Sequence, residues 1–436
     1  MKIVQASDFS LKREVEYGTP EQNEAVARII EAVRQDGDEA LIRFSREFDR
    51  VEIESLRVDA AEIEAAYKQV DAEFVVALRK AAANIRAYHE KQKRNSWMDL
   101  QEDGSILGQV IRPLKRVGLY VPGGTAAYPS SVLMNAIPAQ VAGVREIVIV
   151  TPPATAGSAG VNPHILVAAA EAGITEVYRV GGAQAIAALA YGTASIAAVD
   201  KIVGPGNIYV ALAKRNVFGV VDIDMIAGPT DIVVLADESA DPTYVAADLL
   251  AQAEHDVLSP ATLLTPSLPL AEAVQAELAR QLEVLPRREI AAESTANRGA
   301  IVVTATIDEA VRLANAIAPE HIELLVAEPF ALLPRIENAG AIFLGQYSSE
   351  PVGDYFAGPN HVLPTNGTAR FSSPLSVDDF IKKSSVIHYS REALLASGDM
   401  IMTLARNEGL EGHARAIEVR LNKEKERLNK ERSEGN

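Results

Sequence analysis

Short β-branched runs alternate with alanine-rich helical segments from about residue 106 onward, and this alternation restricts the fold more than any other feature of the chain. Helix 163–172, with Asn162 as its cap and Gly173 as its stop, is typical of the intervening segments. The strand-like runs are 146–150, 176–180, 201–203 and 232–235, and then 261–264, 300–303, 322–326 and 341–344. Strands joined by helices of this length form doubly wound parallel sheets, which bind ligands at the carboxyl ends of their strands. The sequence therefore predicts an α/β protein with such sites.

Composition narrows the class of function. The chain has 436 residues, 48% of them hydrophobic, which predicts a globular protein of two or three domains. Its 42 basic and 59 acidic residues give a net charge of -17, which opposes binding to nucleic acid or to an anionic membrane. No run is apolar enough to span a bilayer and no signal peptide is recognisable, so we expect a cytoplasmic protein that acts on small molecules. The absence of cysteine excludes thiolate metal sites and cysteine nucleophiles.

Two glycine-rich loops follow strand-like runs. The first comprises residues 120–124, from Tyr120 to Gly124, and the second is Gly-Pro-Gly-Asn at 204–207, which opens a helix that extends through Lys214. Such loops let a phosphate approach backbone N–H groups at a helix N-terminus. The usual dinucleotide fingerprint requires a third glycine where Tyr209 stands. Nucleotide binding and a purely structural turn thus remain equally open from these loops.

Gln252 and His255 lie three residues apart in a segment that we predict to be a helix, with Asp241 as cap and Pro242 at its first position. Side chains at this spacing project from one helix face. A neutral imidazole can bind a divalent metal, and a glutamine can add a carbonyl oxygen. A surface glutamine beside a capping histidine would look the same.

The chain has seven histidines, and four of them have acidic or amide neighbours. They are His255, His321 after Glu320, His361 after Asp354 and Asn360, and His413 after Glu408 and Glu411. Each alone is more often structural than functional, but four such clusters in the C-terminal half favour a site. Structural interpretations suffice for His89, His164 and His388.

These motifs together resemble the histidinol dehydrogenase family along nearly the whole chain. The motifs that carry the resemblance are Gly-Pro-Gly-Asn at 204–207, Gln252-Ala-Glu-His255, Pro319-Glu320-His321, Gly353-Asp354 through Asn360-His361-Val-Leu-Pro-Thr, and Glu408-Gly-Leu-Glu-Gly-His413. The resemblance implies a zinc-dependent enzyme that oxidises L-histidinol to the aldehyde and then to L-histidine with two NAD molecules. It also implies a homodimer with two incomplete Rossmann-like domains. This agrees with the absence of the third glycine of the dinucleotide fingerprint.

Site residues follow from the resemblance motif by motif. The zinc ligands would be Gln252, His255, Asp354 and His413, with the substrate completing the coordination; this mixed N/O ligand set does not discriminate sharply against manganese or cobalt. Glu320 would activate water and His321 would accept protons. The missing cysteine supports this assignment, because aldehyde oxidation without a thiol requires a hydrated aldehyde.

Further contacts are implied as well. Tyr120, Gln184 and Asn207 would contact NAD; the substrate would contact Thr230, His361 and Glu408 in addition to Gln252, His255, His321, Asp354 and His413. The Thr230-Asp231 pair departs from the family's Ser-Glu: the hydroxyl is retained, but a methyl is added and the acid is shorter.

The corresponding domain division has four parts. Residues 1–105 form helical segments, 106–125 with 230–385 form the α/β domain that carries most metal and catalytic residues, 126–229 form the second Rossmann-like domain on the NAD side, and 386–436 form a helical tail. The resemblance implies that this tail crosses to complete the partner's site.

Three alternatives remain open at this stage. A dehydrogenase of the same family acting on another small alcohol is nearest. A zinc hydrolase would also need a metal, a glutamate and a histidine, but would leave nicotinamide absorbance unchanged. A non-catalytic nucleotide-binding module would not need four histidine motifs.

Overall fold

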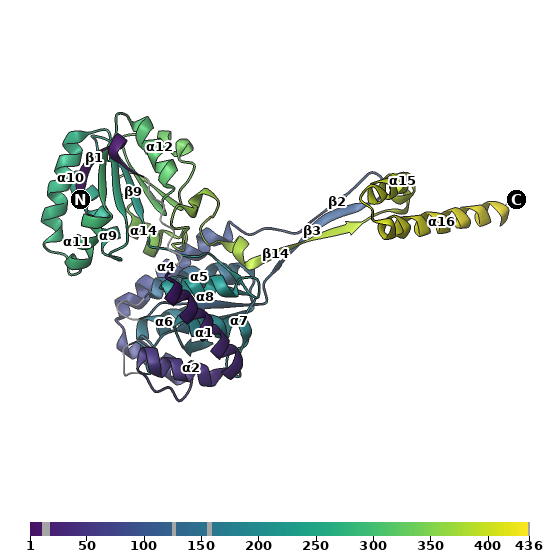
Figure 1. Ribbon diagram of the computed structural model, residues 1–436, viewed down its shortest axis with the longest axis horizontal. Coiled ribbons are helices and arrows are strands. Elements are labelled where there is room, and N and C mark those ends of the chain that lie inside the picture. Colours follow the sequence, from purple (N-terminus) through teal and green to yellow (C-terminus); the bar gives the residue numbers. More distant parts are fainter. Residues whose placement is uncertain (11–17, 124–127, 155–158, 435–436) are drawn as a thin grey trace. The chain divides into compact units, whose positions relative to one another are not determined.

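The computed structural model describes residues 1–10, 18–123, 128–154 and 159–434. The chain divides into two units: Met1–Lys93 with Leu114–Phe380, and Arg94–Pro113 with Ile381–Asn436. The first unit contains two parallel sheets (Figure 1), and the second contains an antiparallel sheet and two helices. Each unit is described separately.

A five-stranded parallel sheet lies in the first unit, with strand order β6-β5-β4-β7-β8. Its strands are β4 (Arg116–Tyr120), β5 (Glu146–Thr151), β6 (Val177–Arg179), β7 (Lys201–Val203) and β8 (Asp222–Ile223). The chain runs outward from β4 to β6 and then returns to place β7 on the other side of β4. The order therefore reverses between β4 and β7, which is the switch point of a doubly wound sheet.

Alternating side chains of β4 bury both faces of this sheet. Val117 and Leu119 pack into one apolar core, and Tyr120 into the other. Figure 1 shows helices on both sides of the strands. One face is covered by α3 (Ala60–Ala66), α4 (Ala72–Glu90), α5 (Pro129–Ala142) and α6 (Pro163–Glu171), and the other by α1 (Pro20–Asp36), α2 (Asp38–Phe44), α7 (Gly182–Tyr191) and α8 (Ile208–Val217).

The second parallel sheet has six strands in the order β1-β11-β10-β9-β12-β13. Its strands are β1 (Lys2–Gln5), β9 (Ile232–Ala236), β10 (Ala261–Thr265), β11 (Ala300–Val303), β12 (His321–Leu325) and β13 (Ala341–Leu344). The strand order reverses again, here between β9 and β12. The prediction of two doubly wound parallel sheets is confirmed.

Helices cover both faces of the six-stranded sheet as well. Ile232 and Val234 pack toward the first of two helix layers, and Val233 and Leu235 toward the second. Figure 1 shows helices on either side of these strands. The first layer is α9 (Pro242–Ala253), α10 (Leu268–Leu282) and α11 (Arg288–Asn297), and the second is α12 (Ile307–Ile317) and α13 (Pro329–Leu332). Asp241 caps α9 and Pro242 begins it, as predicted.

The domain division differs from the one expected from sequence. Residues 106–113 belong to the second unit, and β4 at 116–120 lies in the five-stranded sheet rather than in the sheet that carries Glu320. The N-terminal part is not wholly helical, because Lys2–Gln5 pairs in parallel with β11. Local patterns identify strands but do not specify their partners, and these differences all concern pairing.

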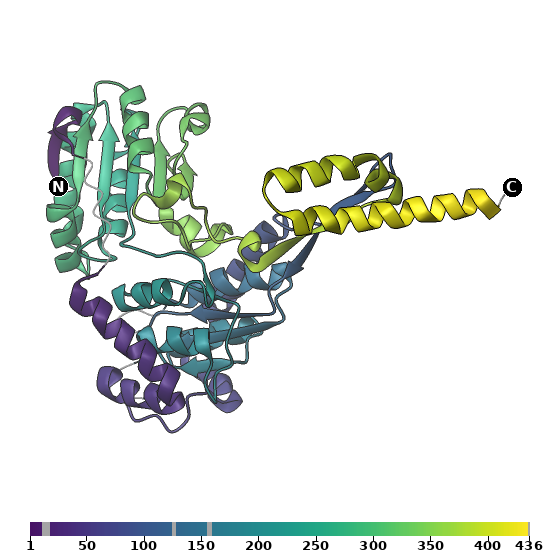
Figure 2. The ribbon, with the colours of Figure 1, turned by 45° about the vertical axis from the view of Figure 1, so that its right-hand side comes forward.

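The second unit is built on three antiparallel strands in the order β14-β3-β2. They are β2 (Trp97–Leu100), β3 (Ile106–Pro113) and β14 (Ile381–His388). Two helices follow, α15 (Arg391–Asn407) and α16 (Glu411–Glu434), which pack side by side through Met402, Ala414 and Leu421 (Figure 2). The helical tail predicted at 386–436 thus begins within β14. Across the described ranges, every helix is too short or too polar to span a membrane.

Candidate active site

The predicted catalytic residues lie at the amino-terminal edge of the six-stranded sheet. Thr230 and Asp231 directly precede β9, Glu320 directly precedes β12, and His321 is the first residue of β12. Helix α9 leaves the carboxyl end of β9 and returns along the sheet, so its last turn brings Gln252 to the same edge. The expectation that this site would lie at the carboxyl ends of the strands is therefore wrong for this sheet, because it considered the strands and not the returning helix.

Gln252 is fully buried, and its side chain uses only half of its hydrogen-bonding capacity. Nε2 donates to Thr230 Oγ1 at 2.9 Å. Among the contacts described, Oε1 has no hydrogen-bond partner. A buried carbonyl oxygen without a partner carries a free-energy cost unless a cation or donor occupies its vicinity. This oxygen is therefore a candidate metal ligand.

His255 lies outside the helix that carries Gln252, contrary to the prediction that both side chains project from one helix face. Helix α9 ends at Ala253, and His255 follows in a turn. Its Nε2 lies 3.7 Å from Glu350 Oε1, and one third of its side chain remains exposed at 33%. The Glu350 carboxylate raises the pKa of the His255 imidazole by hydrogen bonding, against the lowering effect of burial.

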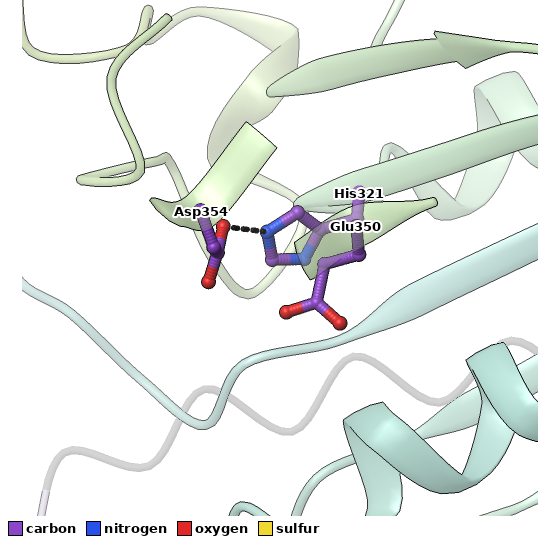
Figure 3. Close-up of side chains that lie close together, drawn as sticks. All are labelled: His321, Glu350 and Asp354. Atoms are coloured by element: carbon purple, nitrogen blue, oxygen red, sulfur yellow. Dashed lines mark ion pairs between the residues drawn. The ribbon is translucent and has the colours of Figure 1, made fainter. Parts of the chain in front are cut away.

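Asp354 and Glu350 come from the segment after β13. Glu350 begins the short helix α14 (Glu350–Val352), and Asp354 lies in the following helical turn η5 (Gly353–Ala357). Asp354 Oδ1 lies 3.8 Å from His321 Nε2. The dashed line in Figure 3 marks this pair. One ligand atom from each of His321, Glu350 and Asp354 lies within 4.8 Å of the others, a spacing suited to one metal ion.

Glu350 was not identified from the sequence. It lies four residues before Asp354 in Ser-Ser-Glu-Pro-Val-Gly-Asp, and an acid next to proline usually reads as an exposed helix start. In the fold its side chain is buried. Its proximity to the Gly353-Asp354 motif was the only available signal.

Glu320 is buried and is bound to its neighbour Asp231 through both backbones. Its Oε2 accepts from the Asp231 N–H at 3.3 Å, and Asp231 Oδ1 accepts from the Glu320 N–H at 3.4 Å. Burial raises the pKa of the Glu320 carboxyl, although His321 and a hydrogen bond with Thr230 lower it in part. Burial also raises the pKa of Asp231 to about 7, and the nearby Glu320 charge adds to this effect.

His321 lies among three carboxylates. Its Nδ1 is 3.1 Å from the Asp231 carbonyl oxygen, so this nitrogen carries the proton and Nε2 faces Asp354. Burial lowers the pKa of the imidazole, but Glu320, Asp354 and Glu350 raise it more, to about 10. A divalent cation among these carboxylates would offset their charge and return the His321 pKa toward the range of a useful base.

His361 has partners at both ring nitrogens. Nδ1 is 3.1 Å from the Asp354 carbonyl oxygen, and Nε2 is 3.2 Å from Ser131 Oγ. The carbonyl can only accept, so Nδ1–H donates to it and Nε2 accepts from the Ser131 hydroxyl. Burial lowers the pKa of this imidazole, which agrees with a neutral ring. His361 thus holds the segment that presents Asp354.

The three residues expected to contact NAD lie at the carboxyl edge of the five-stranded sheet. Tyr120 ends β4, Gln184 lies in the first turn of α7 after β6, and Asn207 caps α8 after β7. Two of these positions, after β4 and β7, flank the switch point, where doubly wound sheets bind ligands. Gly124, the last residue of the first glycine loop, lies outside the described residues.

Glu408 and His413 belong to the second unit. Glu408 is the C-cap of α15, and His413 lies in the first turn of α16. Both are exposed. They therefore belong to a different unit from the other predicted site residues.

A pocket of about 430 Å³ opens beside His255. Arg287 and Glu254 contribute charge, and most of the other lining residues are apolar or aromatic. They are Phe74, Ala77, Leu78, Ala81, Tyr128, Pro129, Ser130, Leu133, Tyr355 and Phe356. A space of this volume accommodates a small organic molecule next to the cluster.

Two doubly wound sheets and a buried cluster of histidine and carboxylate side chains define this protein as an α/β enzyme. Buried and closely spaced titratable groups of this kind are typical of sites that transfer protons.

Comparison with known proteins identifies the family. The sequence model of the histidinol dehydrogenase family matches residues 12–421. A histidinol dehydrogenase of Halalkalibacterium halodurans is 62% identical over 426 residues, which are 98% of this chain and 100% of the relative. That of Bacillus subtilis is 59% identical, with 95% and 97% of the two chains covered. The crystal structure of histidinol dehydrogenase from Elizabethkingia anophelis has a TM-score of 0.90 at 39% identity and covers 94% of each chain.

The chain therefore belongs to the histidinol dehydrogenase family, and it is a dehydrogenase. The resemblance seen in the sequence motifs is confirmed.

Proposed function

We propose that this protein oxidises the primary alcohol L-histidinol to L-histidinaldehyde and then to L-histidine, using one NAD+ in each step. One observation carries the proposal. In a chain of this family, Gln252, His255, Glu320, His321 and Asp354 come from three separate segments and meet at one sheet edge. The role in histidine biosynthesis that the family implies fits a cytoplasmic enzyme.

The site suits a divalent metal, and we propose zinc. Gln252 Oε1, His255 and Asp354 would hold it from this chain, with His413 as the fourth ligand. The unpartnered Gln252 Oε1 and the carboxylate beside His321 support this assignment. Such an ion orients the substrate and polarises its oxygen. Glu350, which lies within ligand range of Asp354, is a further candidate ligand.

His321 and Glu320 divide the proton chemistry. Oxidation of an alcohol requires a base that takes the hydroxyl proton as hydride leaves the carbon, and we assign this task to His321. The aldehyde must next add water, because a chain without cysteine cannot form a thiohemiacetal. The Glu320 carboxyl, whose pKa burial raises, is suited to accept a proton from that water.

The remaining contacts keep their sequence-based assignments. Thr230, His361 and Glu408 would contact the substrate with the metal ligands and His321, and Tyr120, Gln184 and Asn207 would contact NAD+. The contacts of Thr230 with Gln252 and of His361 with Asp354 support a place for both residues beside the substrate. Thr230 supplies the hydroxyl that the family's serine would supply.

We further propose a homodimer in which the second unit completes the partner's site with Glu408 and His413. Its three-stranded sheet exposes apolar side chains on both faces, with Trp97 and Ile387 on one and Met98 and Leu100 on the other. A small sheet with two such faces needs a partner to cover it.

Complementation of inactive variants tests the crossed arrangement. In a mixed dimer of His321→Ala and His413→Ala chains, both lesions fall in one site and the other site is wild type. Random re-association makes about half of the dimers mixed, so roughly a quarter of wild-type activity should return. No recovery after unfolding and refolding the two variants together would contradict the crossing and leave the other assignments intact.

The function itself is tested by NADH absorbance with L-histidinol, compared with other small primary alcohols. The proposal expects NADH to form with histidinol and expects kcat/KM for it to exceed that for the other alcohols. Preference for another alcohol would indicate a different substrate within the family. Product release without NADH would favour the zinc hydrolase.

A further inference from the structure

Lys214 and Asp224 form a buried ion pair that the proposed chemistry does not use. Lys214 lies on α8 and Asp224 just beyond β8, and their side chains are only 2% and 1% exposed. The Lys214 Nζ donates to Asp224 Oδ1. Burial of two opposite charges gives little net stabilisation, because the cost of desolvation offsets much of their attraction.

Both members of the pair also bind the backbone of the same residue of the second glycine loop, Gly204. Asp224 Oδ2 accepts from the Gly204 N–H at 2.7 Å, and Lys214 Nζ donates to the Gly204 carbonyl oxygen at 3.0 Å. Asp224 Oδ1 accepts in addition from the Met225 N–H at 2.6 Å. Gly204, the first residue of the loop that leads to Asn207, is therefore held from both of its backbone polar groups.

The backbone conformation and the close surroundings of Gly204 leave no room for a side chain at this position. Its φ is +113°, and a Cβ placed on it would lie 2.1 Å from the carbonyl oxygen of Tyr120. Only glycine fits this contact. The Tyr120 hydroxyl accepts in turn from the Gly182 N–H at 3.0 Å, two residues before Gln184. The loops of all three proposed NAD residues thus meet around Tyr120.

Stability alone does not account for the ion pair. Apolar residues of similar volume usually stabilise a buried position as well as an ion pair does. Apolar residues cannot supply a donor and an acceptor for the backbone carbonyl and N–H of one residue. The hydrogen bonds to Gly204 are the property that distinguishes Lys214 and Asp224 from an apolar pair.

We propose that Lys214 and Asp224 are positioning residues for the dinucleotide, which fix the 204–207 loop before NAD+ binds. The inference rests on the proposed NAD site at Tyr120, Gln184 and Asn207. Neither charged side chain contacts the nucleotide. They act by holding Gly204 against the end of β4, so that Asn207 and the N-terminus of α8 keep a fixed place.

The test measures steady-state kinetics of the intact enzyme carrying Lys214→Met, and of the double variant Lys214→Met/Asp224→Asn. The double variant has no unpaired buried charge, so it should recover stability that the single variant loses. The hydrogen bond from Nζ to Gly204 is missing from both. We expect KM for NAD+ to rise about tenfold in both, with kcat and KM for histidinol within about twofold of wild type.

Glu176→Gln is the matched control. The Arg116–Glu176 ion pair is also largely buried and lies at the opposite end of the same sheet, with Arg116 Nη1 at 3.0 Å from Glu176 Oε2. Its loss should lower the melting temperature without changing KM for NAD+. A double Lys214/Asp224 variant with wild-type KM for NAD+ would overturn the inference, as would an equal rise in KM for both substrates.

Asn207→Asp separates this inference from the proposed NAD site. It keeps the oxygen that accepts from the Tyr209 and Val210 N–H groups but removes the amide donor. If Asn207→Asp raises KM for NAD+ and the Lys214 variants do not, the site stands and the inference fails. If Asn207→Asp leaves KM for NAD+ unchanged, the site assignment fails.

If the Lys214 variants do not fold, hydrogen exchange of the wild-type enzyme tests the inference instead. In the wild-type enzyme without NAD+, the Gly204 N–H should exchange as slowly as those of β7, because the contacts of Lys214 and Asp224 with Gly204 exist before the ligand binds. Exchange at the rate of an open loop would overturn the inference.

Discussion

The Gln252 side chain donates a hydrogen bond from Nε2 to Thr230 Oγ1 at 2.9 Å. This bond fixes which end of the amide is free, because Nε2 is occupied and Oε1 remains without a hydrogen-bond partner in the described structure. The Thr230 hydroxyl also lies close enough to Glu320 to lower the pKa of its carboxyl. One hydroxyl thus links the candidate metal ligand to the candidate water-activating acid.

Removing that hydroxyl should weaken metal binding. Thr230→Val keeps the shape but leaves Gln252 Nε2 without its acceptor, so the amide can rotate. We expect metal affinity to fall by about 10- to 100-fold, the usual effect of losing a residue that orients a ligand. Competition with a chromogenic chelator measures it. Thr230→Ser is the control and should stay within about threefold; equal losses in both variants would show that the methyl group matters instead.

Glu320 and His321 should affect the two oxidation steps differently. Glu320→Gln is expected to slow oxidation of supplied histidinaldehyde by about 100-fold or more, and to slow alcohol oxidation less, because only the aldehyde step needs added water. His321→Asn should slow both steps. Single-turnover measurements of NADH from each substrate separate them. Equal losses in both steps for both variants would contradict distinct roles.

Metal removal should abolish turnover and leave the fold intact. The apolar cores of both sheets consist of hydrophobic side chains and do not include the candidate ligands. We therefore expect chelation to reduce activity at least 100-fold, with an unchanged far-UV circular dichroism spectrum and recovery on adding Zn²⁺. Cooperative unfolding on chelation would instead show that the metal has a structural role.

Asp49 should make stability depend on pH. Burial raises the pKa of its carboxyl from 3.8 to about 6, and its Oδ2 has no hydrogen-bond partner in the described structure. Ionisation is therefore less favourable in the folded state, and the resulting penalty is absent below pH 3.8, grows up to about pH 6 and is complete above it. Asp49→Asn should raise the melting temperature by roughly 1–3 °C at pH 8, but not at pH 4.

Glu47→Gln, at an exposed position of the same helical turn, is the control for Asp49 and should change nothing at either pH. A gain for Asp49→Asn that is equal at both pH values would show that charge is not the cause.

Local sequence signals predicted the elements well. The run 261–264 became the strand Ala261–Thr265, and Asp241 with Pro242 begins the predicted helix. These features depend on residues within one turn or one strand. The strand Lys2–Gln5 escaped prediction, because it is short, half polar and formed only by pairing with Ala300–Val303 across most of the chain.

The candidate site was predicted residue by residue but not by place. The sequence motifs identified His321 and Asp354, but only the folded structure shows that the two side chains lie close together. The helix α9 that returns to the amino-terminal edge, and the burial of Glu350, depend on how distant segments pack. The same holds for Lys214, which in sequence looks like an exposed helical lysine and is in fact buried against Asp224.

The most direct test of the account counts the NADH formed per histidinol consumed, with free aldehyde trapped in the same reaction. If Glu320 and His321 support hydration and re-oxidation within one site, two NADH should form for each histidinol, and no aldehyde should accumulate. One NADH per histidinol, with aldehyde in solution, would contradict the account.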